Sequence, residues 1–376
     1  MRKIKAFISF ILFAVLLLSV TPVMAEAAPE TPLFQIDFID VGQGDAALVS
    51  CDGHYMLIDG GKAERSSLIY SYLKKRNIKN LDYIVATHAD ADHVGGLAGA
   101  LNYANVGTAY CSETSHDTRA FKSFVKYLNA QGKDITVPSP GEQFSLGSAA
   151  VAVLGPIRKD SESNNNSIVL RIVYGRTSFL FTGDAEEAEE KDILKRYGNL
   201  QSTVLKVAHH GSSSSSSYLF LRSVAPQYAV ISVGSDNTYG HPTEQTLSRL
   251  RDADVKTYRT DMQGTVICTS DGTTVSFQTE KNKDADTLAD SGPGQKSALP
   301  PVGVPAGSAT DGSVQKSQSD SQPAGTYILN TNTKKFHYPE CSSVSDMKEK
   351  NKKVFQGTSA EAQAMGYVPC KRCNPQ

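Results

Sequence analysis

The sequence predicts an α+β protein, and three observations lead to this fold class. Apolar and polar residues alternate along residues 34–38, as they do in a half-buried strand. Asp52-Gly53 lies between apolar runs at 46–50 and 55–58, which is the pattern of a β-hairpin. Residues 66–76 carry apolar side chains at helical spacing on one face. A chain of 376 residues is long enough for one large domain or two modest ones.

Further strands and helices follow along the chain in mixed order. Short apolar runs predict strands at 83–86, 168–173, 178–181, 204–207 and 228–233, and an amphipathic run predicts a helix at 118–129. The strands on either side of Gly175 form a second predicted hairpin. Strands interspersed with helices indicate a mixed fold whose functional side chains lie on loops at the ends of strands.

Composition divides the chain into four segments. Residues 1–25 combine basic residues, an apolar stretch and a small-residue cleavage site, which is the pattern of a secretory signal peptide. The apolar stretch is short for a membrane anchor, so we expect cleavage, a secreted protein and no stable membrane insertion afterwards. A large domain is predicted at 33–280. Residues 281–323 lack aromatic side chains and predict a flexible linker, and a small domain follows at 324–376.

The charge differs between the two predicted domains. Over the whole chain, 38 Lys and Arg balance 39 Asp and Glu, which excludes a uniformly basic nucleic-acid binder. Residues 26–280 carry 23 basic and 30 acidic side chains, whereas residues 324–376 carry 8 basic and 4 acidic ones. The large domain is therefore acidic and the small domain basic.

The most informative stretch is Thr87-His-Ala-Asp-Ala-Asp-His93, which directly follows a predicted buried strand. It offers four potential metal ligands, His88, Asp90, Asp92 and His93. In a strand these side chains would point to opposite faces, so the spacing requires a loop wrapped around an ion. Histidine and carboxylate ligands suit Zn²⁺ or Mn²⁺. The alternative is a solvated polar loop, and this density of ligand types at a strand end argues against it.

Three more candidate positions follow other predicted strands. Asp184 comes after the strand at 178–181, where it can serve as a bridging ligand. His209 and His210 follow the strand at 204–207, and adjacent side chains point in different directions. We therefore expect one of them to bind metal and the other to support a ligand or contact substrate. His241, in Tyr-Gly-His-Pro, is a lone loop histidine, and the convergence of the other motifs favours a functional role for it.

Taken in order, these motifs resemble the metallo-β-lactamase superfamily and, more narrowly, the extracellular metallohydrolase domain of ComEC/Rec2-type DNA-uptake proteins. The resemblance covers residues 33–280 and rests on Asp40-Val-Gly-Gln-Gly-Asp45, Leu57-Ile-Asp-Gly-Gly61, His88-Ala-Asp-Ala-Asp-His93, Gly183-Asp184, His209-His-Gly-Ser212 and Gly240-His-Pro242. It implies an αββα sandwich with the metal site at one edge. Because the channel segments of the DNA-uptake proteins are not recognised here, we expect a stand-alone secreted relative.

The resemblance also implies two divalent metal ions and their ligands. The implied sets are Asp92, His93 and His210 for one metal and His88 and Asp90 for the other, with Asp184 bridging both. Three residues are expected to support these ligands: Asp40, Asp59 and Asn166. The superfamily has a further histidine ligand where residues 164–167 read Asn-Asn-Asn-Ser here. The His88/Asp90 site is therefore expected to be oxygen-rich and weak, and better suited to Mn²⁺ or Mg²⁺ than to Zn²⁺.

Such a metal pair predicts hydrolysis of a phosphodiester, with DNA or RNA as the leading substrate. Asp92 would orient the nucleophile, and His209 or His241 would stabilise charge or protonate the leaving oxygen as the other catalytic residues. A role in competence follows from the resemblance alone, and the sequence identifies no protein partner.

Two alternatives to a nuclease stay open at this point. The acidic large domain counts against nucleic acid, because DNA-binding surfaces are usually basic. The first alternative is hydrolysis of another ester, such as a phosphorylcholine-bearing cell-wall polymer or a lactone. The second is a non-catalytic nucleic-acid-binding protein that uses the small domain.

The small domain carries a metal-ligand pattern of its own. His337-x₃-Cys341 and Cys370-x₂-Cys373 supply four ligands that can close a tetrahedral structural zinc site. The segment resembles small Ada-like metal-binding domains through Gly366-Tyr-Val-Pro-Cys-Lys-Arg-Cys373. Disulfides are the alternative, which an oxidising compartment favours. We expect zinc, a short helix from residue 360 to 365, and weak, salt-sensitive binding of nucleic acid.

Three further cysteines, Cys51, Cys111 and Cys268, show no metal-ligand spacing. We expect them to be buried free thiols, and the sequence leaves open whether two of them form a disulfide.

Overall fold

The chain divides into two units, residues 1–297 and 298–376. The computed structural model describes residues 34–289 except 199, and residues 325–375 except 332, 340, 346, 360, 361, 363, 364, 366, 371, 372 and 374. The predicted signal peptide, the predicted linker from residue 290 onwards and most of the predicted helix at 360–365 lie outside the described residues.

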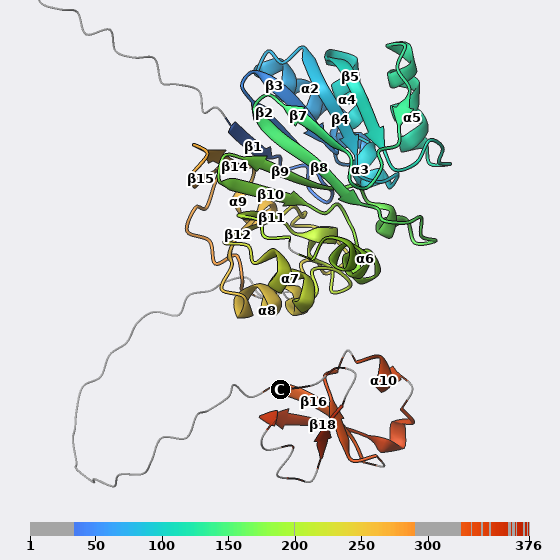
Figure 1. Cartoon of the computed structure of the whole chain (residues 1–376), viewed down its shortest axis with the longest axis vertical. Helices are drawn as coiled ribbons and strands as arrows, with labels where there is room; N and C mark the ends of the chain where they lie inside the picture. Colours follow the sequence, from blue (N-terminus) through green and yellow to red (C-terminus); the bar gives the residue numbers. More distant parts are fainter. Residues whose placement is uncertain are drawn as a thin grey trace, which may run out of the picture. The chain divides into compact units, whose positions relative to one another are not determined.

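Two sheets form the large unit (Figure 1). The first has the strand order β15-β14-β1-β2-β3-β4-β5-β6. Its strands are β1 (Phe34–Phe38), β2 (Ala47–Cys51), β3 (His54–Ile58), β4 (Asn80–Ala86), β5 (Asn105–Cys111), β6 (Ile135–Thr136), β14 (Val266–Ser270) and β15 (Val275–Thr279). The second has the order β13-β12-β11-β10-β9-β8-β7. Its strands are β7 (Gln143–Leu146), β8 (Ala149–Gly155), β9 (Val169–Tyr174), β10 (Thr177–Phe181), β11 (Val204–Lys206), β12 (Tyr228–Ile231) and β13 (Lys256–Arg259).

Helices cover the outer face of each sheet (Figure 1). The first sheet carries α2 (Ser66–Lys75), α4 (Leu97–Tyr103) and α5 (Arg119–Ala130), and the second carries α6 (Glu187–Tyr197), α7 (Tyr218–Val224) and α8 (Glu244–Asp252). Short elements lie in the loops: η1 (Ala63–Arg65), α3 (Ala91–Val94), η2 (Ser163–Asn166), η3 (Ala208–Gly211) and α9 (Thr260–Gln263). The order of layers is helices, sheet, sheet, helices, which confirms the expected αββα sandwich.

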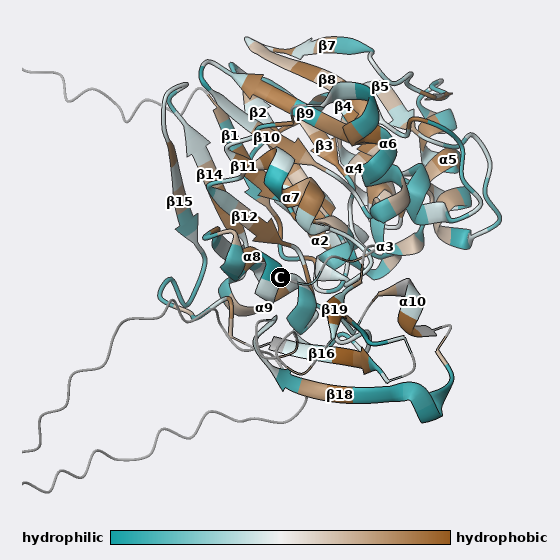
Figure 2. Ribbon diagram, turned by 60° about the horizontal axis from the view of Figure 1, so that its bottom comes forward, coloured by the Kyte–Doolittle hydropathy of each residue, from teal (hydrophilic) through white to brown (hydrophobic). Residues whose placement is uncertain are grey.

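Alternation along the strands explains these layers. Inward side chains from both sheets form one core, in which Phe34 of β1 stacks on Phe179 of β10 with ring centroids 4.8 Å apart. Outward side chains such as Leu48 pack under the helices of the first sheet, and Leu180 packs under those of the second. Figure 2 accordingly shows hydrophobic strands inside and hydrophilic residues on the outer faces of helices such as α6.

Parallel strands bring several loops to one edge of the sandwich. In the first sheet, β3 and β4 run parallel, and in the second, β10, β11 and β12 run parallel. The carboxyl ends of parallel strands lie at the same edge of a sheet, so the segments after these five strands meet there. This edge is where the sequence motifs gather.

The predicted start of the linker at residue 281 is corrected by the structure. Residues 281–289 lie against the large unit, where the Thr287 hydroxyl donates to the Thr257 carbonyl oxygen at 2.7 Å. The buried Arg259 guanidinium donates to the Thr287 carbonyl oxygen at 3.3 Å. A buried guanidinium needs acceptors, and this stretch of backbone supplies one. Composition does not report such contacts, so it placed the boundary too early.

The small unit is a sheet with the strand order β18-β16-β17-β19. Its elements are β16 (Gly325–Asn330), β17 (Lys335–His337), α10 (Ser342–Ser345), η4 (Glu349–Asn351), β18 (Lys352–Gly357) and β19 (Val368–Pro369). Its core contains Tyr327, Leu329, Phe336, Ala362 and Tyr367. Across the described part of both units, no helix has the length and apolar character needed to span a bilayer.

Candidate metal centre

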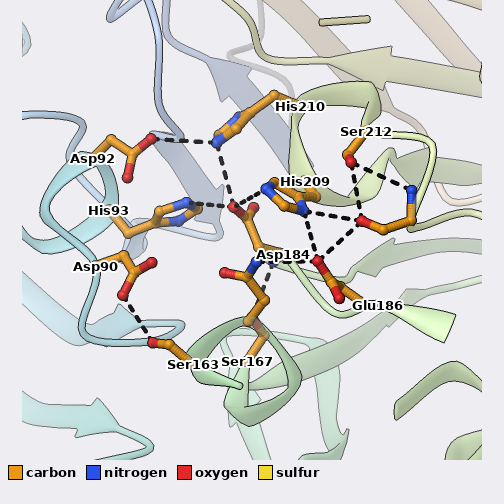
Figure 3. Close-up of polar contacts among 12 residues, drawn as sticks. Asp90, Asp92, His93, Ser163, Ser167, Asp184, Glu186, His209, His210 and Ser212 are labelled. Carbon is orange, nitrogen blue, oxygen red and sulfur yellow. Dashed lines mark hydrogen bonds and ion pairs between the residues drawn. The ribbon is translucent and has the colours of Figure 1, made fainter. Parts of the chain in front are cut away.

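The motif residues meet at the shared edge of the two sheets (Figure 3). The loop after β4 leads into α3, which carries Asp92 and His93, and the first sheet supplies His88 and Asp90 from the same loop. The second sheet supplies Asp184 after β10 and His209 and His210 within η3 after β11. The side chains of the two sheets point toward one another, with Asp184 in the middle (Figure 3).

Distances place the Asp184 carboxylate at the centre of the cluster. Its Oδ2 lies 3.3 Å from His93 Nε2 and 3.5 Å from His210 Nε2. On the other side of His210, Asp92 Oδ2 lies 3.6 Å from His210 Nε2. The His88 ring packs beside the His93 ring with centroids 4.2 Å apart. Four trios in the large unit offer ligand atoms that all lie within 4.8 Å of one another. Two consist only of predicted ligands, namely His88, His93 and Asp184, and Asp92, His93 and His210, and the other two include Asp45.

Several buried polar atoms of the cluster have no hydrogen-bond partner among the described residues. They include the Nε2 atoms of His88, His93 and His210 and the Oδ1 atom of Asp184. A buried polar atom without a partner destabilises a protein by about 1–3 kcal/mol. These four atoms belong to the two trios of predicted ligands, so coordination to divalent metal in those trios would satisfy them.

The other ring nitrogen of each histidine is already engaged. His93 Nδ1 lies 2.9 Å from Asp59 Oδ2, and His210 Nδ1 lies 2.9 Å from the carbonyl oxygen of Ser232. An oxygen acceptor at Nδ1 keeps the proton there and leaves the lone pair on Nε2. The oriented tautomers therefore present Nε2 as the metal-binding atom.

The charges of the cluster are strongly coupled. Burial opposes a charged His210, but the carboxylates of Asp184 and Asp45 outweigh it and raise the pKa of His210 to about 10. Burial also raises the pKa of Asp92, yet His210 and His93 bring that pKa down to about 2. Protons on the imidazoles thus balance the carboxylates. A metal ion must displace these protons, so binding should weaken as the pH falls.

The two adjacent histidines differ in their surroundings, and this separates their roles. His210 is buried, and its Nε2 faces Asp184 and Asp92. The His209 side chain is 22% exposed, and its Nε2 lies 3.9 Å from Asp184 Oδ2. His209 Nδ1 lies 3.3 Å from Glu186 Oε1. The geometry favours His210 as the metal ligand and places His209 at the edge of the cluster.

The Asp59 side chain holds the loop that carries the metal ligands. The sequence resemblance implies a supporting role for this residue. Its Oδ1 accepts a hydrogen bond from Thr87 N at 2.8 Å. Its Oδ2 accepts from Thr87 Oγ1 at 2.7 Å and contacts His93 Nδ1. One carboxylate thereby holds both the start of the loop and the His93 ring.

Asp40 and Asn166 do not contact the ligands in this way, which corrects the sequence-based expectation. Asp40 Oδ1 accepts from Gly42 N at 3.0 Å and shapes the turn after β1. Asn166 bonds to the backbone of Asp160 and Glu162 and closes the loop that leads into β9. Both residues are short polar side chains in loops, where bonds to nearby backbone are the usual outcome.

Sequence reasoning missed several residues that contact the cluster. Asp45 Oδ1 lies 3.1 Å from His210 Nδ1, and Asp45 Oδ2 accepts from the buried Lys206 ammonium at 2.8 Å. Ser163 donates to Asp90 Oδ1 at 2.8 Å, and the Ser167 hydroxyl accepts from Asp184 N at 3.0 Å. Asp45 lies in a recognised motif and could have been singled out. Nothing in the sequence distinguishes the two serines from other loop serines.

His241 lies at the rim and is half-buried. Its ring centroid is 5.4 Å from that of His209, at an interplanar angle of 80°. Burial, together with the nearby His209 and His210, lowers the pKa of His241 to about 4. The structure therefore brings this residue next to the cluster but outside the two ligand trios.

The small unit holds a second cluster, made of His337, Cys341, Cys370 and Cys373. One ligand atom from each residue lies within 4.8 Å of all the others. Both ring nitrogens of His337 are buried without a hydrogen-bond partner in the described part of the chain. No disulfide joins any of the described cysteines, and Cys51, Cys111 and Cys268 of the large unit are buried. A lone imidazole surrounded by three thiols fits zinc better than a disulfide.

We expect the purified chain to retain one zinc ion in the small unit. Replacing Cys373 with serine should lower zinc retention at this site, because a hydroxyl is a much weaker ligand than a thiolate. Elemental analysis after dialysis, with thiol titration under denaturing conditions, measures both metal and disulfide content. Ser343→Ala in α10 serves as a control. A chain with no zinc and two oxidised cysteines in this unit would contradict the expectation.

The αββα fold carries its His/Asp cluster at the edge where the two sheets meet, and the residues of this cluster fit a divalent metal. Residues 39–235 match the family model of the metallo-beta-lactamase superfamily, and residues 316–376 match the metal binding domain of Ada. The chain belongs to the metallo-β-lactamase superfamily.

Individual proteins are also similar to this chain. ComE operon protein 3 of Bacillus subtilis is 30% identical over 251 residues, which cover 62% of this chain and 32% of that protein. Competence protein ComA of Neisseria gonorrhoeae is 34% identical over 241 residues, which cover 64% of this chain and 32% of that protein. The matched part thus spans about a third of these relatives. A solved metallo-beta-lactamase fold protein, YhfI of Bacillus subtilis, aligns at 13% identity with a TM-score of 0.42 over 60% of this chain and 95% of that protein.

Proposed function

We propose that this chain is a secreted, metal-dependent phosphodiesterase that hydrolyses DNA or RNA. The observation that carries the proposal is the set of unpaired Nε2 atoms of His88, His93 and His210 around the Asp184 carboxylate. Two relatives with similar large domains bear competence names, which supports nucleic acid as the substrate. The apolar segment within residues 1–25 supports secretion.

The proposal assigns metal-binding and catalytic roles to individual residues of the cluster. Asp92, His93 and His210 would hold one divalent ion, His88 and Asp90 would hold a second, and Asp184 would reach both. Divalent ions bound there would make hydroxide available at neutral pH and stabilise charge on a phosphoryl oxygen. Asp92, whose side chain is 23% exposed, would orient the attacking water. His209, at the rim of the cluster, would protonate the leaving oxygen. The His241 ring contacts His209, but its lowered pKa leaves it neutral near pH 7, so its role would be to stabilise charge as a hydrogen-bond donor.

The second metal position is the weaker one in this proposal. It has one histidine, His88, and one carboxylate, Asp90, which also accepts a hydrogen bond from Ser163. Ser167, whose hydroxyl lies 3.4 Å from His88 Nδ1, belongs to the segment where the superfamily places another histidine. An oxygen-rich position of this kind favours Mn²⁺ over Zn²⁺.

A cleavage assay tests the proposal. The protein is stripped of metal, resupplied with Mn²⁺ or Zn²⁺, and given plasmid DNA, single-stranded DNA and RNA. We expect metal-dependent cleavage that an Asp92→Ala/His93→Ala variant loses. His54→Ala serves as the matched control, because His54 begins β3 at the end of the strand away from Asp59 and is half exposed. This control should cleave as the wild type does.

Other outcomes would overturn the proposal in different ways. Stoichiometric metal in the large unit without cleavage of any nucleic acid would point to another ester as the substrate. Neither metal nor cleavage would leave a non-catalytic binding protein.

A further inference from the structure

Tyr239 is an exposed aromatic side chain at the rim of the metal centre. It lies in the segment between β12 and α8, and 63% of it is accessible to solvent. Tyrosine combines an apolar ring with a polar hydroxyl, so an exposed tyrosine beside a candidate site can contact a ligand. The position of Tyr239 relative to the cluster indicates which kind of ligand this is.

A series of rings leads from Tyr239 to the cluster. The Tyr239 ring stacks on His241 with centroids 5.7 Å apart and an interplanar angle of 25°. His241 in turn meets His209 at 5.4 Å, and His209 Nε2 lies 3.9 Å from Asp184 Oδ2. Two ring contacts thus lead from Tyr239 to His209, and one further contact leads to Asp184, which is proposed to hold metal.

The loop that carries Tyr239 is fixed before any ligand binds. Asn237 Nδ2 donates to the carbonyl oxygens of Gly234 and His241, both at 2.7 Å. Asn237 Oδ1 accepts from His241 N at 3.0 Å. These three bonds close the loop from residue 234 to residue 241, which contains Tyr239. A ring carried on a loop held in this way binds at a lower entropic cost than one on a flexible loop.

We propose that Tyr239 is a stacking platform for an unpaired base of the nucleic acid, next to the phosphodiester at the metal centre. The proposal rests on the proposed function and names its substrate class as single-stranded nucleic acid or a frayed end. One face of the tyrosine packs on His241, and the exposed remainder is open to a base. In a duplex both faces of a base are already covered by its neighbours, so this contact requires an unpaired base.

The charge of the large unit makes such a platform important. Residues 26–280 carry 30 acidic and 23 basic side chains, so the domain does not attract phosphates by its overall charge. Stacking on an aromatic ring does not depend on charge or base identity. The platform therefore supplies affinity that the electrostatics of this unit does not.

The platform is tested by combining variants of the protein with variants of the substrate. Wild type, Tyr239→Ala and Tyr239→Phe are compared on a single-stranded oligonucleotide and on the same strand with an abasic site at successive positions beside the cleaved bond. Loss of one base stack should raise KM of Tyr239→Ala roughly 10-fold or more on the normal strand, with a smaller change in kcat. At the abasic position that removes the stacked base, wild type and Tyr239→Ala should become equal. Tyr239→Phe, which keeps the ring, should retain the wild-type KM.

A binding measurement separates this proposal from the proposed function. Single-stranded DNA that carries 2-aminopurine should lose fluorescence when it binds the wild type and Tyr239→Phe, and keep it with Tyr239→Ala. Tyr218→Ala, which removes an equally large ring that is 54% exposed on α7, is the control and should quench as the wild type does. Quenching without cleavage would refute the nuclease and keep the platform. Equal KM values for wild type and Tyr239→Ala, or an equal loss on normal and abasic strands, would refute the platform.

Discussion

Replacing Asp184 with asparagine is expected to reduce metal-dependent cleavage on the order of 10³-fold, because several kcal/mol of charge stabilisation depend on the metal centre. The Asp184 carboxylate lies 3.3 Å from His93 Nε2 and 3.5 Å from His210 Nε2. Asparagine has the same shape but no charge, so it is a weak ligand and no longer balances the two imidazoles. We therefore also expect the variant to lose metal during dialysis. The rate at saturating Mn²⁺ and the metal content of the dialysed protein measure the two effects.

A matched control separates this effect from a general loss of acidic charge. Asp117 is exposed on the loop after β5, where its carboxylate pairs with Lys122. Asp117→Asn makes the same chemical change at the surface and should leave rate and metal content unaltered. Circular dichroism should show that both variants are folded. An Asp184→Asn protein with full metal content and an undiminished rate would remove Asp184 from the metal centre, and the shared cluster with it.

Elements with strong local signals could be predicted from the sequence. The Asp52-Gly53 turn predicts a hairpin, and the structure pairs β2 with β3 around it, with Cys51 opposite His54. The apolar spacing at 66–76 predicts the helix that the structure begins at Ser66 and ends at Lys75. Both patterns depend on residues that are neighbours in sequence, so tertiary contacts have little to change.

Elements whose identity depends on distant partners could not be predicted in this way. The run Ala-Ala-Val-Ala-Val-Leu-Gly at β8 is too short and alanine-rich to distinguish strand from helix by periodicity. The strand β14 lies between β15 and β1, and its Cys268 is opposite Ile36, more than 200 residues earlier in the chain. A strand pattern contains no information about which strand will be its neighbour.

The same distinction applies to the site. Ligands crowded into one loop, such as His88 and His93, are recognisable because four candidate side chains follow one strand. The sequence shows Lys206 only as part of a predicted apolar strand, because its partner Asp45 is 161 residues away in sequence. Once folded, Lys206 is 4% exposed and links the second sheet to the loop after β1. Supporting residues of this kind become visible only with the fold.

Replacing Lys206 with methionine is expected to destabilise the large unit by about 3–5 kcal/mol, because it removes the ammonium partner of the buried Asp45 carboxylate and leaves only His210 beside it. The Lys206 ammonium donates to Asp45 Oδ2 at 2.8 Å and to the Val207 carbonyl oxygen at 3.0 Å. Methionine keeps most of the side-chain volume and removes the charge. Urea unfolding of the metal-free protein, followed by circular dichroism, measures the loss. Metal affinity should also fall, by about 10–100-fold, since Asp45 contacts the His210 ring.

The pH dependence of this loss shows whether charge is its cause. Burial raises the pKa of Asp45, and Lys206 and His210 together bring it below its usual value. In the wild type, the stability that this group contributes is present above the unfolded-state pKa and disappears as the pH falls through the lower, folded-state pKa. Without Lys206, burial favours a protonated Asp45 and its folded-state pKa rises. The difference in stability between Lys206→Met and wild type should therefore be smaller at pH 5 than at pH 8.

The double variant Asp45→Asn/Lys206→Met completes the argument. It removes both charges, so no buried charge lacks a partner, and most of the stability lost in Lys206→Met should return. Metal affinity should stay low in the double variant, because a neutral amide beside His210 Nδ1 no longer favours the electron-donating ring that a carboxylate does. If both stability and metal affinity recover, the ion pair has only a structural role in connecting the sheets and does not influence the metal site. A loss that is equal at both pH values and persists in the double variant would instead assign the effect to packing of the lysine methylenes.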